Sequence, residues 1–202
     1  MKSFAMRVVF QAVAALSLMA FSGVAAADEE REIDRRGVYL GFAGMGNFVV
    51  NQSSAPVNGF IAQGGGGAVF FGVRLASVLA LEAGYSLNVH NPVRDYYGAT
   101  TSALLLHSGT LDLKFIFPNH SSLRPFVEGG LGLYELAAFP NGTDFRNGLG
   151  FQLGGGLDIW LGRHLSLGAR ALYHGVSFTE NIGNGKPFLS TVSVEGNLQL
   201  HF

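Results

Sequence analysis

The chain has 202 residues, of which 29 are glycine and only 13% are charged, about half the charged fraction of an average soluble domain. It contains no cysteine, which excludes a disulfide framework and a thiolate metal or redox site. The length fits one domain, and the formal net charge of −1 argues against a nucleic-acid partner.

The first 27 residues have the pattern of a secretory signal peptide. Lys2 and Arg7 form a basic start, an apolar run follows, and the alanines at 25–27 give a cleavage signal. The alternative, an N-terminal membrane anchor, is less favoured because the apolar run is short and contains Gln11. Residues 28–36 carry five acidic residues and three arginines. We interpret them as a charged, solvated periplasmic lead-in, with a contact to a periplasmic partner as the alternative.

From residue 37 to the end, apolar and polar residues alternate with a period of two, which indicates strands with two different faces. The pattern predicts strands at 37–47, 67–75, 79–87, 109–117, 125–135, 149–161, 165–178 and 191–202. Long connections at 48–66, 88–103, 137–147 and 179–189 alternate with short turns at 76–78, 118–123 and 162–164. The sequence therefore predicts an all-β fold, an eight-stranded antiparallel up-and-down barrel over residues 37–202.

The glycines of the polar face decide between a soluble, lipocalin-like barrel and a transmembrane one. Glycine weakens a strand, so a solvated surface gains nothing from it, whereas a narrow interior needs small residues beside bulky ones. The bulky residues of that face are Tyr39, Phe70, Tyr134 and Trp160. We therefore predict a transmembrane barrel with its apolar face outward. Aromatic residues near the strand ends are expected to form interfacial girdles, namely Phe48, Phe117, Tyr134, Trp160, Phe178 and Phe202.

The predicted inward face gathers eight charged residues: Arg74, Glu82, Asp112, Lys114, Glu128, Asp158, Arg170 and Glu195. Buried charges need partners, and the interior of an eight-stranded barrel is about wide enough for side chains alone. We predict an ion-pair network that plugs the barrel. The alternative is a gate in a narrow pathway for ions or small solutes, with Lys114 or Arg170 exchanging carboxylate partners.

Two runs, TLDLKFIF at 110–117 and RPFVEGGLGLY at 124–134, carry a resemblance to a known family. Together with the signal peptide, the eight strands and the terminal Phe202, they resemble the small OmpA/OmpX-like outer-membrane barrels of Gram-negative bacteria. The resemblance covers the mature chain and implies an outer-membrane location reached through the periplasm. We expect a monomer without a cofactor, and no peptidoglycan-binding domain after the barrel.

The same resemblance implies roles for particular residues. It places an interior charged core at Glu82, Lys114, Asp158 and Arg170, where Asp158 is shorter than the glutamate of the family. It also implies that the last strand, through Leu198, Leu200 and Phe202, is recognised by the outer-membrane assembly machinery. The expected partners are that machinery, periplasmic chaperones, and outer-membrane lipid including lipopolysaccharide.

The long connections are where binding of a surface ligand is expected, because loops carry most binding sites. Tyr and Arg are frequent binding anchors, and the candidates are Arg94, Tyr96, Tyr97, Phe145, Arg146 and Lys186. The alternative is that these residues are solvated tips.

Other motifs carry little chemistry. Some small barrels modify lipid A with a His and a Ser on one strand face, but His174 and Ser177 are three residues apart and fall on opposite faces. No histidine has metal-ligand spacing, and His164 and His201 are expected to be solvated. The glycines at 64–67 are interpreted as a flexible loop. The predicted role is thus non-enzymatic, in envelope integrity or surface binding through the loops, with a narrow pore as the alternative and a lipid A-modifying enzyme less favoured.

Overall fold

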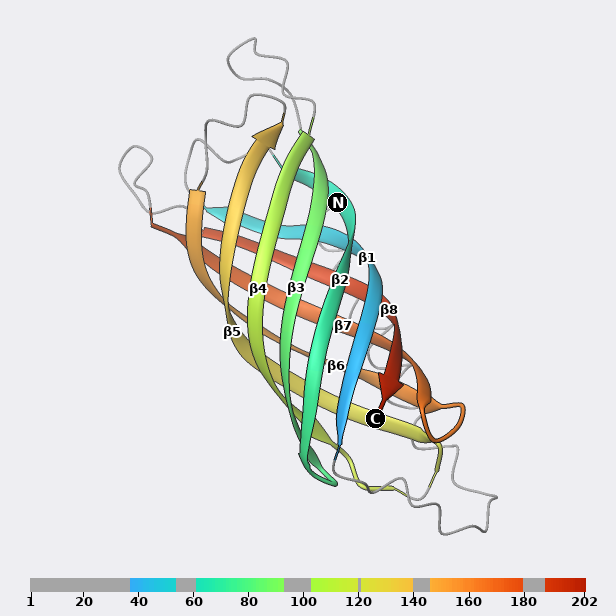
Figure 1. Ribbon diagram of the computed structural model, residues 1–202. Coiled ribbons are helices and arrows are strands. Elements are labelled where there is room, and N and C mark those ends of the chain that lie inside the picture. The colour runs from blue at the N-terminus through green and yellow to red at the C-terminus, as the bar shows by residue number, and fades with distance from the viewer. Residues whose placement is uncertain (1–36, 54–60, 93–102, 120, 140–145, 180–187) are drawn as a thin grey trace.

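The computed structural model describes residues 37–53, 61–92, 103–119, 121–139, 146–179 and 188–202. The predicted signal peptide and lead-in lie outside the described residues. The described residues form eight strands, which are β1 (Val38–Ser53), β2 (Ile61–Ala76), β3 (Leu79–Pro92), β4 (Ala103–Ile116), β5 (Leu123–Phe139), β6 (Arg146–Trp160), β7 (Leu165–Phe178) and β8 (Phe188–His201) (Figure 1). No helix in this part of the chain is long and apolar enough to cross a membrane.

Each strand pairs antiparallel with the next, and β8 pairs with β1, so the sheet closes into a barrel (Figure 1). The closing seam runs from Tyr39 opposite His201 to Ser53 opposite Phe188. This confirms the predicted eight-stranded antiparallel barrel. Closure pairs the backbone of every strand on both sides and leaves no open edge.

Short turns join β2 to β3, β4 to β5 and β6 to β7 at one end of the barrel, as predicted. We call this the turn end, and the opposite end, where the other four connections join the strands, the loop end. In the β4–β5 turn the Asn119 side chain donates to the Leu123 carbonyl at 2.7 Å, and the Ser121 hydroxyl donates to the same oxygen at 2.9 Å. Such side chains replace backbone partners in a tight turn.

The strands continue farther toward the loop end than the sequence predicted, because backbone pairing persists where side-chain alternation is weak. The glycines at 64–67, predicted as a flexible loop, lie inside β2 and pair with both neighbours, as in Gly67 opposite Gly44 and Gly66 opposite Asn88. A Cβ at Gly66 would collide with the Leu87 carbonyl oxygen. Glycine here permits a close approach of two strands, so the loop prediction is wrong.

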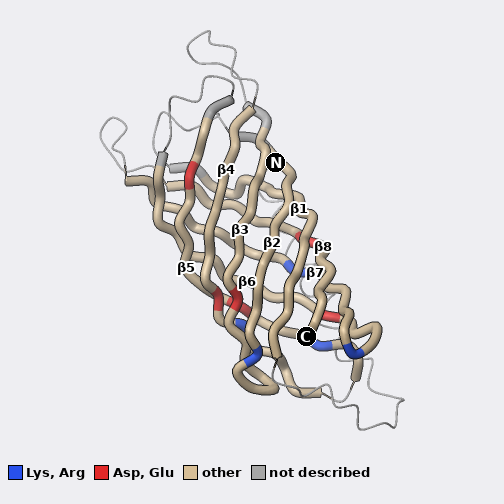
Figure 2. Tube along the Cα trace, viewed as in Figure 1, with Lys and Arg blue, Asp and Glu red and all other residues tan. Residues whose placement is uncertain are grey.

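The two faces of the barrel differ as predicted. The outward Leu131, Leu133 and Leu149 are 72%, 67% and 66% exposed, whereas the inward Tyr39 and Phe70 are buried. Charged residues are sparse along the chain and gather mainly in the half nearer the turn end (Figure 2). An apolar exterior around a polar interior is the arrangement of a transmembrane barrel.

Inward glycines provide space for aromatic rings. A Cβ at Gly41 would overlap the ring of Phe70 on the next strand, and a Cβ at Gly72 would overlap the ring of Tyr39. The prediction that glycines accommodate bulky neighbours in a narrow interior is confirmed at these positions.

The prediction of aromatic girdles is wrong for three of six residues. Phe48, Phe117 and Phe202 are exposed, but Tyr134 and Phe178 are buried inside the barrel, and Trp160 also faces inward. Strand parity overrides nearness to a strand end, since Tyr134, Trp160 and Phe178 all fall on inward positions.

His201 was expected to be solvated and is instead packed at the turn end. Its ring stacks on Trp160 with centroids 3.9 Å apart, and its Nε2 lies 2.8 Å from Ser166 Oγ. Position 201 has inward parity, and the ring therefore helps to close the turn end of the lumen. His164 is exposed, as predicted.

Candidate functional site

Six charged side chains meet inside the barrel because each occupies an inward position on one of six successive strands. They are Glu82 on β3, Lys114 on β4, Glu128 on β5, Asp158 on β6, Arg170 on β7 and Glu195 on β8. The register brings Lys114 opposite Glu128 and Arg170 opposite Glu195. We call these six residues the ion-pair layer.

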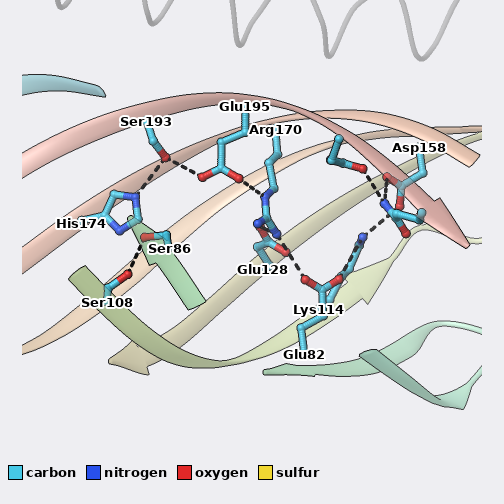
Figure 3. Close-up of polar contacts among 12 residues, drawn as sticks. Glu82, Ser86, Ser108, Lys114, Glu128, Asp158, Arg170, His174, Ser193 and Glu195 are labelled. Carbon is cyan, nitrogen blue, oxygen red and sulfur yellow. Dashed lines mark hydrogen bonds and ion pairs between the residues drawn. The ribbon is translucent and has the colours of Figure 1, made fainter. Parts of the chain in front are cut away.

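The two cations of the ion-pair layer bind all four of its carboxylates (Figure 3). Lys114 Nζ donates to Asp158 Oδ2 at 2.9 Å and lies 3.3 Å from Glu82 Oε1. Arg170 Nη1 lies 3.2 Å from both Glu82 Oε2 and Glu128 Oε1. Arg170 Nε donates to Glu195 Oε2 at 2.7 Å. Glu82 thus bridges the two cations across the lumen.

Neutral side chains supply further hydrogen bonds to the carboxylates, which outnumber the cations. The Tyr39 hydroxyl donates to Glu82 Oε1 at 2.6 Å, and Gln199 Nε2 donates to Asp158 Oδ1 at 2.8 Å. Charge-assisted hydrogen bonds of this kind are stronger than neutral ones. They offset part of the cost of burying more carboxylates than cations.

Aromatic rings support both cations. Lys114 Nζ lies 3.7 Å from the centroid of the Phe126 ring. The guanidinium carbon of Arg170 lies 4.7 Å from the centroid of the Phe70 ring. Cation–π contacts gain strength where water is excluded, and the Lys114 side chain is only 2% exposed. The arrangement holds each cation in one place and can act chemically as a fixed plug.

The structure gathers six of the eight predicted charged residues into these ion pairs. It places Asp112 beside them on β4, buried and directly opposite Glu82. Arg74 lies nearer the turn end, with its guanidinium carbon 5.0 Å from the centroid of the Trp160 ring. Asp158, although shorter than glutamate, reaches Lys114, so the charged core implied by the resemblance is complete.

The neutral members of the network were not predicted as partners of the charges. The inward parity of Tyr39 and Gln199 places both in the interior but does not show which carboxylates they contact. Their partners Glu82 and Asp158 lie on other strands across the lumen, and that cross-barrel contact depends on the register of all the strands in between. No sequence signal gives this register.

A second closed region lies toward the loop end. Buried apolar side chains from β4 and β5 meet those from β7 and β8, and we call them the loop-end cluster: Leu106, Tyr134, Leu136, Val176, Phe178 and Leu189. All are at most 8% exposed. Because β4 and β8 lie on opposite sides of the barrel, the cluster fills the lumen here with apolar side chains from both sides.

Polar side chains fill the level between the two regions. Ser86 Oγ and Ser108 Oγ lie 2.7 Å apart, and His174 Nε2 lies 3.0 Å from Ser193 Oγ (Figure 3). A cavity of about 30 Å³ here is bordered by Ser86, Ser108 and His174. That is room for about two water molecules. This cavity is therefore much too small for a solute.

The His–Ser chemistry considered from the sequence is not assembled on one face. His174 is inward, whereas Ser177 is exposed on the outside, as their spacing predicted. The inward Ser193 is fully buried and donates its proton to Glu195 Oε1 at 3.0 Å rather than to His174. This geometry does not prepare Ser193 as a nucleophile. Among the described residues, no group of three or more His, Asp or Glu side chains could hold a metal ion.

Most of the predicted loop-binding residues lie outside the described residues: Arg94, Tyr96, Tyr97, Phe145 and Lys186. Arg146 was predicted in a loop but is the first residue of β6. In the last strand, Leu198, Leu200 and Phe202 face outward and Gln199 faces inward, in agreement with the alternation predicted for residues 191–202. Their role in assembly stays a prediction.

Comparisons with known proteins agree with this geometry. The crystal structure of Neisserial surface protein A is similar with a TM-score of 0.64 and 16% identity, over 82% of this chain and 97% of that one. OprG of Pseudomonas aeruginosa is similar with a TM-score of 0.54 and 13% identity, over 84% of this chain and 97% of that one. At these identities the likeness concerns the fold. No curated protein sequence is similar enough to be counted as a relative.

A family model gives the broader assignment. The model described as the outer membrane protein beta-barrel domain matches residues 13–202, which include all eight strands. The chain therefore belongs to the outer membrane protein beta-barrel domain family and is a transmembrane barrel of the Gram-negative outer membrane.

Proposed function

We propose that the protein is a closed, non-enzymatic barrel that supports envelope integrity and binds surface ligands through its extracellular connections. The observation that carries this proposal is the double closure of the lumen, by the ion-pair layer and by the loop-end cluster. A pathway for solutes would have to break both. The cavity between the two regions, about 30 Å³, is too small for a solute and favours a filled structural barrel over a pore.

Planar-bilayer recording tests the closed barrel. We expect the reconstituted protein to give no stable unitary conductance. A stable conductance that disappears in Lys114→Met or Arg170→Met would overturn the proposal in favour of the gated pore, because those cations would then be the gate. Circular dichroism of each variant checks that the barrel is still folded.

A deletion strain tests the role in the envelope. We expect loss of the protein to raise sensitivity to detergents and large antibiotics, and the wild-type gene to restore resistance. A second gene, in which Arg94, Tyr96 and Tyr97 are replaced by alanine, distinguishes the contribution of the barrel from that of the extracellular connection. Restoration by both genes assigns integrity to the barrel, and restoration by the wild type alone assigns it to the extracellular connection. Unchanged sensitivity in the deletion strain would refute the integrity role.

Lipid A mass spectra test the enzymatic alternative. We expect expression of the protein to leave the spectra unchanged, because Ser193 is buried and hydrogen-bonded to Glu195. A new lipid A species that is absent in Ser193→Ala would contradict the non-enzymatic assignment.

A further inference from the structure

A row of polar side chains interrupts the apolar exterior of the barrel. On β4 the outward Phe115, Leu113 and Leu111 are exposed and apolar, but the outward His107 is not. The Tyr85 hydroxyl of β3 lies 2.6 Å from His107 Nδ1, on the exposed surface. The pair is therefore built on the face that contacts lipid rather than in the lumen.

The row extends over two more strands. His107 is directly opposite Glu135 on β5, and Glu135 is directly opposite Asn147 on β6. All three have outward parity, so we call Tyr85, His107, Glu135 and Asn147 the outward polar row. Asn147 is one residue from the loop-end start of β6, and the row thus rises toward the loop end.

The level of the row in the membrane follows from the fold. Barrels of this kind have short periplasmic turns and longer extracellular connections, which places the loop end outside and the row in the outer leaflet. The outward Leu87 and Leu133 flank it, and the outward Val89 lies farther toward the loop end, all three exposed, so the row lies within the outer-leaflet part of the apolar belt. A polar group facing hydrocarbon without a partner costs several kcal/mol.

The Tyr85–His107 hydrogen bond satisfies only part of the row. It fixes the orientation of the His107 ring and leaves Nε2 directed elsewhere. Among the described residues, no ion pair or hydrogen bond engages the Glu135 carboxylate. The row thus presents an imidazole nitrogen, a carboxylate and an amide to the surrounding lipid.

The charges and hydrogen-bonding groups of the outward polar row determine which groups of a lipid it can bind. It contains one carboxylate and no lysine or arginine, so it repels phosphate. A carboxylate and an imidazole bind hydroxyl and amide groups well, as does the Asn147 side chain. We propose that the outward polar row binds the sugar hydroxyl and amide groups of an outer-leaflet glycolipid, the backbone of lipopolysaccharide.

Thermal unfolding in defined vesicles tests this binding. A ligand that binds the folded barrel raises its melting temperature by mass action. In phosphatidylcholine vesicles containing lipopolysaccharide, we expect a higher melting temperature than in phosphatidylcholine alone for the wild type and for the control Ser177→Ala, an outward polar residue on β7. His107→Leu and Glu135→Gln should lose most of this rise. Each variant is compared with itself in the two vesicles, so a general loss of stability cancels.

A third kind of vesicle distinguishes contact with the sugar backbone of the glycolipid from contact with its phosphates. Lipid A stripped of its phosphates should still stabilise the wild type, because the row contacts the sugar backbone. A rise that needs the phosphates and Mg²⁺, or one that Glu135→Gln and His107→Leu retain in full, would overturn the proposal.

Discussion

Nearer the turn end of the lumen, Arg170 and Lys114 hold four carboxylates in the ion-pair layer, whereas nearer the loop end Leu106, Leu136 and Leu189 meet across the barrel without charge. Both regions close the same tube, but they respond differently to damage. Removing one partner of a buried ion pair leaves an unpaired charge, while shortening an apolar side chain leaves a cavity. The ion-pair layer is therefore the more sensitive of the two to the loss of one side chain.

The largest effect on stability is expected from Arg170→Met. The substitution leaves Glu82, Glu128 and Glu195 without the guanidinium that binds all three, and breaking such a site costs about 3–5 kcal/mol. Urea unfolding of the refolded barrel, followed by the fluorescence of Trp160, the one tryptophan of the chain, measures the free energy of unfolding. The control Arg163→Met, in the exposed β6–β7 turn, should change it by less than about 0.5 kcal/mol. Equal losses in the two variants would show that the ion-pair layer is not a special source of fragility.

A smaller loss is expected in the apolar region from Leu189→Ala. Leu189 is 1% exposed, and its truncation removes buried methyl groups and leaves a cavity, for a cost of about 2–4 kcal/mol. The matched control is Leu131→Ala on the lipid-facing surface, where lipid fills the vacated space and no cavity forms. The same unfolding measurement compares them. If Leu131→Ala were as damaging as Leu189→Ala, packing across the lumen would not be what stabilises the loop-end cluster.

A third comparison concerns the aromatic residues that border the ion-pair layer. Gly72→Ala should cost about 1–3 kcal/mol, because the new methyl group overlaps the ring of Tyr39, whose hydroxyl donates to Glu82. The control Gly44→Ala places a methyl group on the outward face, where nothing lies within 4 Å. It should be neutral or slightly stabilising, because alanine has fewer unfolded conformations than glycine. If the two variants had similar effects on the free energy of unfolding in urea, the inward glycines would not be needed to make room for aromatic rings.

Much of the fold was predictable because strand alternation is a local property. The parity of Glu82, Lys114, Asp158 and Arg170 is visible in the sequence, and so is their shared location in the interior. The ends of the strands were less predictable, since the glycines at 64–67 give no alternation although their backbone pairs on both sides. Interior residues near strand ends, such as Phe178, were assigned outward because position was weighed above parity.

The chemistry of the loop-end half was missed for a related reason. Leu189 lies in a segment that was predicted as a connection, and Leu106 lies just before the predicted strand at 109–117, so their inward parity was never counted. The contact between opposite walls also depends on the register and shear of the whole barrel, which no local pattern records. Sequence alone therefore identified the ion-pair layer but gave no sign of the second closure.

The smallest effect on stability is expected at the end of the closing seam, outside both regions. Phe202 is 74% exposed, and its backbone nitrogen donates to the Val38 carbonyl at 2.9 Å. Deleting it should lower the free energy of unfolding of a refolded barrel by only about 1 kcal/mol. The resemblance noted in the sequence assigns this residue to recognition by the assembly machinery, so the deletion should lower the amount of heat-modifiable barrel in outer membranes far more than it lowers stability.

Phe117→Ala is the matched control for this deletion, because Phe117 is another exposed aromatic residue at the turn end. It should assemble normally, since it leaves the last strand intact. If the chain without Phe202 reached the outer membrane as well as the Phe117→Ala variant, the terminal aromatic residue would be one more lipid-facing side chain of β8. If the chain without Phe202 failed to reach the outer membrane but unfolded normally in vitro, two separate requirements would determine the residues of β8. Its inward positions, including Glu195 and Gln199, would be fixed by the ion-pair layer, and its outward end by the machinery that inserts it.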